Sequence, residues 1–247
     1  MKRIILTLLV WFLCFGGMLF DGADDKIPCG DVAPFSGSTA SWSFWIKPIS
    51  QTSGDTIWDK LIGTYNGSTV YWRSGDEIAL FIGNDANFMG WQTDAANFSN
   101  GVLYHVVILY VEDSSAEFYV NGVFKACSVI SNGGDNGIAD IAQPAIIGAN
   151  NAASTYSEGT ITELALWNTS LTPSEIESLA SGKAMLPLQI QASSLVGYWP
   201  LIEVGEGVSG DGATFLNYKT PGTYNGVGDD GAGNSGLTGT ASERLTY

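Results

Sequence analysis

The sequence predicts an all-β protein made of two facing antiparallel sheets with one short helix. Three observations indicate this fold class. Short apolar runs alternate with turns rich in Gly, Asn, Asp and Ser along the 247-residue chain. Hydrophobic residues make up 45% of the sequence and charged residues only 14%, which allows a large core. The links between the apolar runs are turn-like and contain no helical crossover, so neighbouring strands must be antiparallel.

The run at residues 41–48 has the clearest strand pattern. Trp42, Phe44 and Ile46 share one face of this predicted strand, while Trp45 and two serines share the other. The run at 103–111 is apolar on both faces, which is typical of a central strand. Further strands are predicted at residues 77–83, 144–148 and 160–167.

A hairpin is predicted over residues 116–127. Asn121 and Gly122 lie in its middle and supply the two positive-φ residues of a type I′ turn. Such a turn joins two neighbouring antiparallel strands directly. The hairpin therefore supports the antiparallel arrangement of the sheets.

One helix is predicted over residues 173–180. Thr172 is a suitable N-cap, Pro173 fits the first helical position, and Glu175 completes a capping box. Gly182 follows the helix and marks its end.

The first 17 residues are typical of an export signal. Lys2 and Arg3 precede an apolar run, and small residues predict a cut before Gly17. Two alternatives stay open: residues 1–17 remain as a hydrophobic anchor, or translation starts at Met18. Residues 18–247 then form the domain, which is secreted or displayed at the cell surface if the leader is used.

Seven short motifs occur in an order that resembles the laminin G-like jelly-roll module of the concanavalin A-like lectin/glucanase superfamily. They are FDGADD, SWSFWIKP, LYHVVILY, AEFYVNGV, IIG, GTITELALWN and LTPSEIESLASG. Each motif alone is weak, whereas the order of all seven is specific and covers residues 18–182. The resemblance implies a jelly-roll sandwich and a role in binding.

The segment SLVGYWPLIEVGEG at residues 194–207 is similar to the strand that usually opens such modules. Here it follows the helix, so the resemblance implies one of two arrangements. Either the domain is permuted and residues 194–247 supply a late strand and a Gly-rich, loosely held tail, or the segment is the beginning of a second module that is cut short. The late strand can complete its own sheet, or it can pair with a neighbouring molecule and form an oligomer by strand exchange.

The charge of the chain limits its partners. The formal net charge is −15, and a surface this acidic repels both nucleic acids and anionic lipid headgroups. Nucleic-acid binding and strong membrane binding are therefore not expected. An acidic surface suits Ca²⁺, and it also keeps a protein soluble.

Beyond the leader, Cys29 and Cys127 are the two cysteines of the sequence. In an oxidising compartment they can pair, and they can equally serve as small buried hydrophobic residues. The sequence has no Cys/His cluster for a zinc or iron site.

Catalysis is not expected. His105 is the one histidine of the sequence, and it lies inside an apolar strand where a structural role is expected. The glycoside hydrolases of the superfamily use carboxylates at alternate positions of one strand. Here Glu163 stands alone in its strand, and Asp76 and Glu77 are adjacent and face opposite ways.

Calcium is the cofactor that the sequence favours. The DGADD turn concentrates three aspartates, and the resemblance places it near the strand that contains Glu163. We therefore expect Asp24, Asp25 and Glu163 to hold a structural Ca²⁺ through their oxygens. The alternative is a plain turn with solvated carboxylates.

A sugar ligand would need an aromatic ring that can stack on a pyranose face. Trp45, Trp72 and Trp91 are the candidates for ligand binding, although large aromatics more often fill cores. The leading hypothesis is a non-catalytic extracellular binding module for glycans or proteins. The alternative is a structural assembly protein of a virion, which a start at Met18 would suit, or of a cell-surface filament; a glycoside hydrolase is the least favoured.

Overall fold

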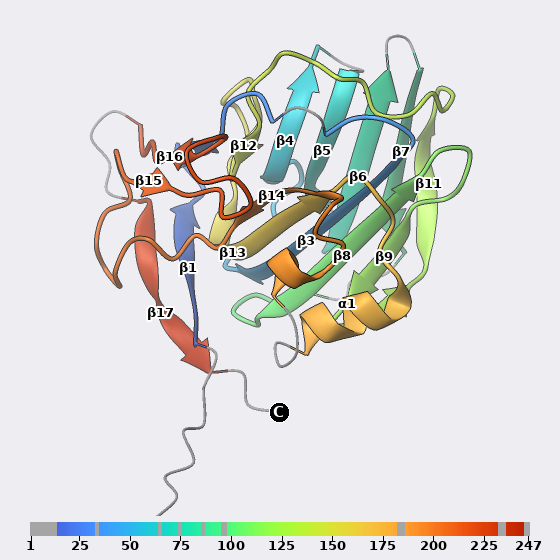
Figure 1. Cartoon of the computed structure of the whole chain (residues 1–247). Coiled ribbons are helices and arrows are strands. Elements are labelled where there is room, and N and C mark those ends of the chain that lie inside the picture. Colours follow the sequence, from blue (N-terminus) through green and yellow to red (C-terminus); the bar gives the residue numbers. More distant parts are fainter. Residues whose placement is uncertain are drawn as a thin grey trace, which may run out of the picture.

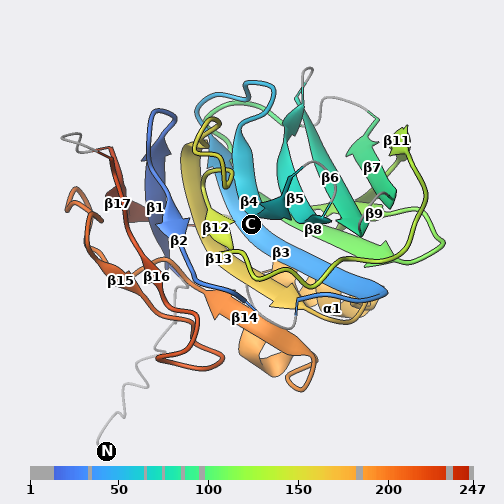
Figure 2. The same ribbon diagram turned by 90° about the horizontal axis from the view of Figure 1, so that it is seen from above.

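Two large antiparallel sheets face one another and enclose the core (Figures 1 and 2). The computed structural model describes residues 14–32, 35–63, 66–73, 76–84, 87–94, 98–181, 186–231 and 236–244. Every pairing between named strands in these residues is antiparallel, and one α-helix is present among them. The predicted two-sheet sandwich is therefore confirmed.

The first sheet contains eight of the described strands, with the order β10-β9-β8-β3-β13-β1-β17 and with β14 also paired to β13. Their bounds are β1 Cys14–Asp21, β3 Thr39–Pro48, β8 Tyr104–Val111, β9 Glu117–Val120, β10 Val123–Lys125, β13 Glu158–Trp167, β14 Leu195–Trp199 and β17 Thr238–Arg244. We call it the front sheet.

The second sheet contains seven of the described strands in the order β11-β7-β6-β5-β4-β12-β2. Their bounds are β2 Ile27–Pro28, β4 Thr56–Ile62, β5 Asn66–Arg73, β6 Glu77–Asn84, β7 Asn87–Thr93, β11 Cys127–Asn132 and β12 Ile146–Ile147. We call it the back sheet. A small pair, β15 (Thr214–Phe215) and β16 (Gly226–Val227), lies outside both sheets.

Side chains alternate along β3 as the sequence predicts. Trp42, Phe44 and Ile46 are buried in the core between the sheets, because alternate residues of a strand project to the same side. The tryptophan rings of Trp58 and Trp199 connect the two sheets, with ring centroids 6.2 Å apart. Burying these aromatic rings stabilises the sandwich, because each ring removes a large apolar area from water.

The helix α1 (Pro173–Ala180) covers the outer face of the front sheet. Its capping box is formed as predicted: the Glu175 N–H donates to the Thr172 hydroxyl, and the Glu175 carboxylate accepts from the Thr172 N–H. Ile176 and Leu179 pack into a second apolar cluster with residues of β8, β13 and β14. A short 3₁₀ helix, η1 (Pro187–Gln189), lies next to β14.

The strand β13 has two different neighbours along one side. β1 pairs with its first half, from Glu158 to Ile161, and β14 pairs with its second half, from Leu164 to Trp167. Between the halves the register shifts, and Glu163 adopts a positive φ of 54°. The late strand therefore completes the sheet of its own chain, as the permuted arrangement implies.

The described residues after β14 do not form a loosely held tail, so that expectation is wrong for this part of the chain. Phe215, Asn217 and Leu237 are fully buried, and β17 pairs with β1 along the edge of the front sheet. Glycines make this packing possible: a Cβ on Gly228 would lie 2.0 Å from the backbone oxygen of Gly210.

The predicted leader falls mostly outside the described residues, which begin at residue 14. Residues 14–17 belong to β1, so a cut before Gly17 would shorten this strand but would keep its pairing with β13 from Met18 onward. Cleavage, anchoring and a start at Met18 stay predictions. None of the helices in the described residues has the length and hydrophobicity needed to cross a membrane.

Both cysteines considered for a disulfide are free in the structure. Cys29 is fully buried in the core beside β2, and its thiol donates to the Ile27 carbonyl. The thiol of Cys127, at the start of β11, donates to the Ala116 carbonyl. Both therefore act here as small, partly apolar side chains, which was one of the two expectations.

Candidate functional site

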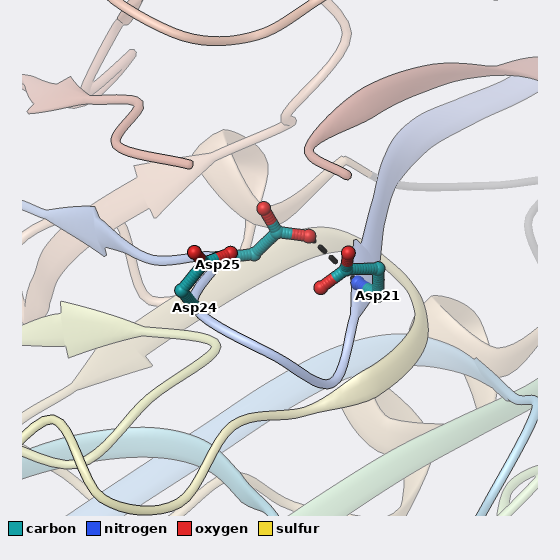
Figure 3. A group of neighbouring side chains, drawn as sticks. All are labelled: Asp21, Asp24 and Asp25. Carbon is teal, nitrogen blue, oxygen red and sulfur yellow. Dashed lines mark hydrogen bonds between the residues drawn. The ribbon is translucent and has the colours of Figure 1, made fainter. Parts of the chain in front are cut away.

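Three aspartates gather where β1 ends. Asp21 is the last residue of β1, Gly22 turns the chain with a φ of 81°, and the chain then places Asp24 and Asp25 opposite Asp21. One carboxylate oxygen from each of the three lies within 4.8 Å of the other two. Figure 3 shows the Asp25 carboxylate lying between the carboxylates of Asp24 and Asp21. We call these residues the aspartate cluster.

Backbone groups hold only part of the cluster. The Asp21 N–H donates to Asp25 Oδ2 at 2.6 Å, and the Ala23 N–H donates to Asp21 Oδ1 at 2.8 Å. By contrast, Asp24 Oδ1 and Asp25 Oδ1 are buried and receive no hydrogen bond from the described residues. Unpaired buried oxygens are costly, and native structures rarely leave them without a partner.

Asp25 is a member of the cluster whose pKa is shifted. Its side chain is fully buried, and this burial raises its pKa from 3.8 to about 7. The negative charges of Asp21 and Asp24 raise the pKa further, while the hydrogen bond from the Asp21 N–H lowers it. A positive charge between the three carboxylates would relieve this repulsion.

The donor set fits a hard divalent cation. Carboxylate oxygens are the ligands that Ca²⁺ prefers, and two of the oxygens present have no other partner among the residues that the structure describes. Two of the three predicted metal residues, Asp24 and Asp25, lie in the cluster, and sequence reasoning missed Asp21. The DGADD turn itself could have revealed it, because a Gly turn brings the residues on either side together.

Glu163 does not join the cluster, so its expected place there is wrong. The β13 bulge turns it toward β14, where its carboxylate accepts a hydrogen bond from the Tyr198 hydroxyl. Burial raises the pKa of Glu163 from 4.5 to about 7. It therefore belongs to a separate buried pair on the front sheet.

The three tryptophans proposed for ligand binding are buried. Trp72 is 0% exposed and Trp91 1% exposed because both project from the back sheet into the core. Trp45 is 5% exposed on the outer face of the front sheet, where its ring lies 5.0 Å from the ring of His105. The expectation that these rings are open to a sugar is wrong, since none of them presents a free face.

The strands that bury Trp72 and Trp91 place other aromatic rings on the opposite face. Tyr71, Phe81 and Phe88 come from β5, β6 and β7, and each is half-buried on the outer face of the back sheet. The ring centroids of Tyr71 and Phe81 are 5.9 Å apart, and those of Phe81 and Phe88 are 6.3 Å apart with nearly parallel planes. We call these three residues the aromatic row.

The Phe81 ring lies close against the sheet. A Cβ on Gly90 would be 2.8 Å from this ring, so the ring rests on the bare backbone of β7. The sheet therefore covers part of the Phe81 ring, and the side chain stays half-buried. Next to the row, Arg73 Nε donates to Gln92 Oε1 at 3.2 Å, which supplies fixed polar groups beside the aromatic surface.

His105 has the surroundings of a structural residue. It is 1% exposed, its Nε2 lies 2.9 Å from the Ser43 hydroxyl, and burial lowers its pKa from 6.5 to about 3. The histidine is therefore neutral at physiological pH and is closed off from solvent. Its position supports the structural interpretation made from the sequence.

The two-sheet fold agrees with the protein family that the sequence matches. A laminin G-type family model, described as the Concanavalin A-like lectin/glucanases superfamily, matches residues 21–177, which is more than half of the chain. The chain belongs to this superfamily. The strands β14 and β17 lie outside the matched range.

Solved structures share the fold of this laminin G-like domain at low identity. A candidate carbohydrate-binding protein from Bacteroides ovatus ATCC 8483 is similar with a TM-score of 0.61 and 15% identity over 94% of this chain. This chain spans 61% of that protein. The botulinum neurotoxin serotype D ligand-binding domain, solved with N-acetylneuraminic acid, has a TM-score of 0.51 and 16% identity over 68% of this chain and 42% of its own. No protein with a curated description matches the sequence.

Proposed function

We propose that this laminin G-like domain is a non-catalytic, extracellular glycan-binding module that uses the outer face of the back sheet. The aromatic row is the observation on which the proposal rests. Sugar rings have apolar faces that stack on aromatic rings, and Tyr71, Phe81 and Phe88 offer such rings side by side. The spacing of about 6 Å between neighbouring rings suits an extended saccharide that contacts more than one ring.

Polar groups beside the row would orient the sugar. The Arg73–Gln92 pair can donate to and accept from hydroxyl groups, while the rings supply contact area. The names of the Bacteroides protein and of the neurotoxin domain refer to carbohydrate or sialic acid, which supports a glycan rather than a protein as the first ligand class to test.

We further propose that the aspartate cluster holds a structural Ca²⁺. The cation would bind Asp21, Asp24 and Asp25 through oxygens that are already turned toward one another. It would neutralise the carboxylates and fix the turn, and it would take part in no reaction.

A glycan panel with matched variants tests the binding proposal. We expect the wild-type chain to bind at least one glycan and the double substitution Tyr71→Ala with Phe81→Ala to weaken binding about 10-fold or more, because central aromatic contacts typically cost over 1 kcal/mol when removed. Phe124→Ala is the control, since Phe124 is 55% exposed on β10 of the front sheet, whereas the row lies on the outer face of the back sheet.

Two results would count against the proposal. One is the absence of any binding across the panel by calorimetry. The other is equal weakening by the row variant and by Phe124→Ala, which would place the ligand elsewhere. Circular dichroism of each variant checks that the sandwich is intact, and release of reducing sugar from the bound glycan would indicate an enzyme instead.

A further inference from the structure

Part of the chain that follows β14 lies against the aspartate cluster. We call residues 200–231 and 236–244 the C-terminal segment. Lys26 and Asp229 exchange two backbone hydrogen bonds of 2.9 Å, and their side chains form an ion pair of 3.0 Å. The loop that follows the cluster is therefore joined to the C-terminal segment by one short β-bridge.

Two glycines bring the C-terminal segment still closer. A Cβ on Gly231 would lie 2.2 Å from Asp24 Oδ2, and a Cβ on Gly236 would lie 2.2 Å from Asp21 Oδ2. Any larger residue at either position would push a carboxylate out of the cluster. The backbone of the C-terminal segment thus forms one wall of the cluster, opposite the turn that supplies the three aspartates.

This wall brings more negative charge with it. Asp230 is 5% exposed, and the carboxylates of Asp211 and Asp24 lie close enough to repel its negative charge. Several carboxylates therefore lie at the interface between the turn and the C-terminal segment. Lys26 forms its ion pair with Asp229 there. Without a cation, these charges oppose the docking of the segment.

We propose that a divalent cation in the aspartate cluster acts as a clasp, so that its binding and the docking of the C-terminal segment onto the sandwich are thermodynamically linked. The inference rests on the cation site proposed above. Its second support is the fully buried Asp25 side chain, whose Oδ1 has no partner among the described residues. A cation that contacts both the aspartate turn and the C-terminal segment stabilises the form in which the segment is docked. It leaves the stability of the undocked form unchanged.

Hydrogen–deuterium exchange of the full chain, with Ca²⁺ or with a chelator, measures this linkage. We expect Ca²⁺ at 100 times its dissociation constant to slow exchange of backbone amides in residues 226–231 and 237–240 by about 100-fold. Amides of β6 in the centre of the back sheet should change little, because they do not open with the segment.

Two glycine substitutions separate the clasp from general packing. Gly236→Ala places its Cβ on the Asp21 carboxylate at a residue without a positive φ, so the effect is steric. We expect it to lower Ca²⁺ affinity at least 10-fold. Gly205→Ala is the matched control in the same segment, because its Cβ would meet only Val208 Cγ2 at 3.7 Å, and it should keep the affinity within about twofold.

A charge substitution covers the case in which Gly236→Ala fails to fold. Asp24→Asn keeps the size of the side chain and removes one negative charge. It should abolish the Ca²⁺ response, while in chelator its C-terminal segment should exchange no faster than that of the wild type, because repulsion falls.

The outcomes distinguish the clasp from the cation site and from glycan binding. If Ca²⁺ binds and slows exchange in residues 21–25 but not in the C-terminal segment, the clasp is wrong and the cation site stands. If calorimetry detects no Ca²⁺ binding, both fail, while glycan binding by the aromatic row is unaffected. Slower exchange of the segment in Ca²⁺, lost in Asp24→Asn, supports the clasp.

Discussion

Glu163 gives the stability of this domain a pH dependence that can be measured directly. Its carboxyl is held in the β13 bulge, where it accepts from the Tyr198 hydroxyl, and its N–H donates to the Pro200 carbonyl at 3.2 Å. Burial raises its pKa from 4.5 to about 7, the Tyr198 hydrogen bond lowers it, and the charge of Glu203 raises it. The folded chain therefore keeps this proton at pH values where the unfolded chain has lost it.

The sign and size of the effect follow from this difference. Between pH 4.5 and 7 the folded state binds one more proton than the unfolded state at this site, so the free energy of unfolding falls as the pH rises. The slope is about 1.4 kcal/mol per pH unit, and the total loss is about 3 kcal/mol by pH 8. Below pH 4.5 both states are protonated and the contribution of Glu163 is fully present.

The substitution Glu163→Gln removes the titration and keeps the shape of the side chain, since the amide oxygen can still accept from Tyr198. We expect the variant to match the wild type at pH 4.5 and to be more stable at pH 8, by at most about 3 kcal/mol. Urea unfolding at both pH values, with a chelator present, measures the difference. The chelator keeps a cation at the aspartate cluster from contributing.

The pKa of Asp25 is also about 7, so Asp25 contributes to the pH dependence of the wild type as well. The difference in stability between Glu163→Gln and the wild type at each pH removes this contribution, because both proteins contain Asp25. Tyr198→Phe serves as a second variant, because it removes the hydroxyl that hydrogen-bonds to Glu163 and leaves the carboxyl able to titrate. Parallel curves of stability against pH for the wild type and Glu163→Gln would refute the argument, since they would mean that Glu163 has the same pKa in both states.

Two further substitutions test the fold itself. Thr172→Ala removes the capping box of α1 and should cost about 1 kcal/mol of unfolding free energy, visible as a lower melting temperature, whereas an unchanged melting temperature would mean that the cap is redundant. Lys60→Met removes a buried ammonium that donates to the Ile141 carbonyl at 2.6 Å and pairs with Asp31 at 3.0 Å, and it should cost about 1–2 kcal/mol in urea unfolding. Equal or greater stability of this variant would show that the desolvation of Lys60 outweighs its contacts.

The alternating strands of the fold could be predicted from the sequence because their two faces differ. In β3 the inward residues are large and apolar, and β8 is apolar throughout, as expected for a strand at the centre of a sheet. By contrast, β5 and β7 contain Asn and Gly, which have low strand propensity. These strands form because each pairs on both sides within the back sheet, and that support cannot be read from their own residues.

The candidate sites also differ in how far the sequence alone could predict them. The aspartate cluster is local, since three residues of one turn meet, and the sequence accordingly predicted two of them. Glu163 was misplaced because a single bulge with a positive φ changed its direction. In β5, Tyr71 and Trp72 are both aromatic, so alternation alone could not tell which ring faces the core; pairing with the rest of the back sheet decides it.

The pairing of β1 with β17 also determines how the domain would respond to a pulling force. Cys14 lies opposite Arg244, so the two strands leave the sheet at the same end. A load applied between these two residues would break the hydrogen bonds between β1 and β17 one after another. It would not load all of these bonds at the same time, as a force along the strands would. Tension in an anchored chain would therefore detach β17 first, at low force, while the pairing of β1 with β13 and the core between the sheets stay intact.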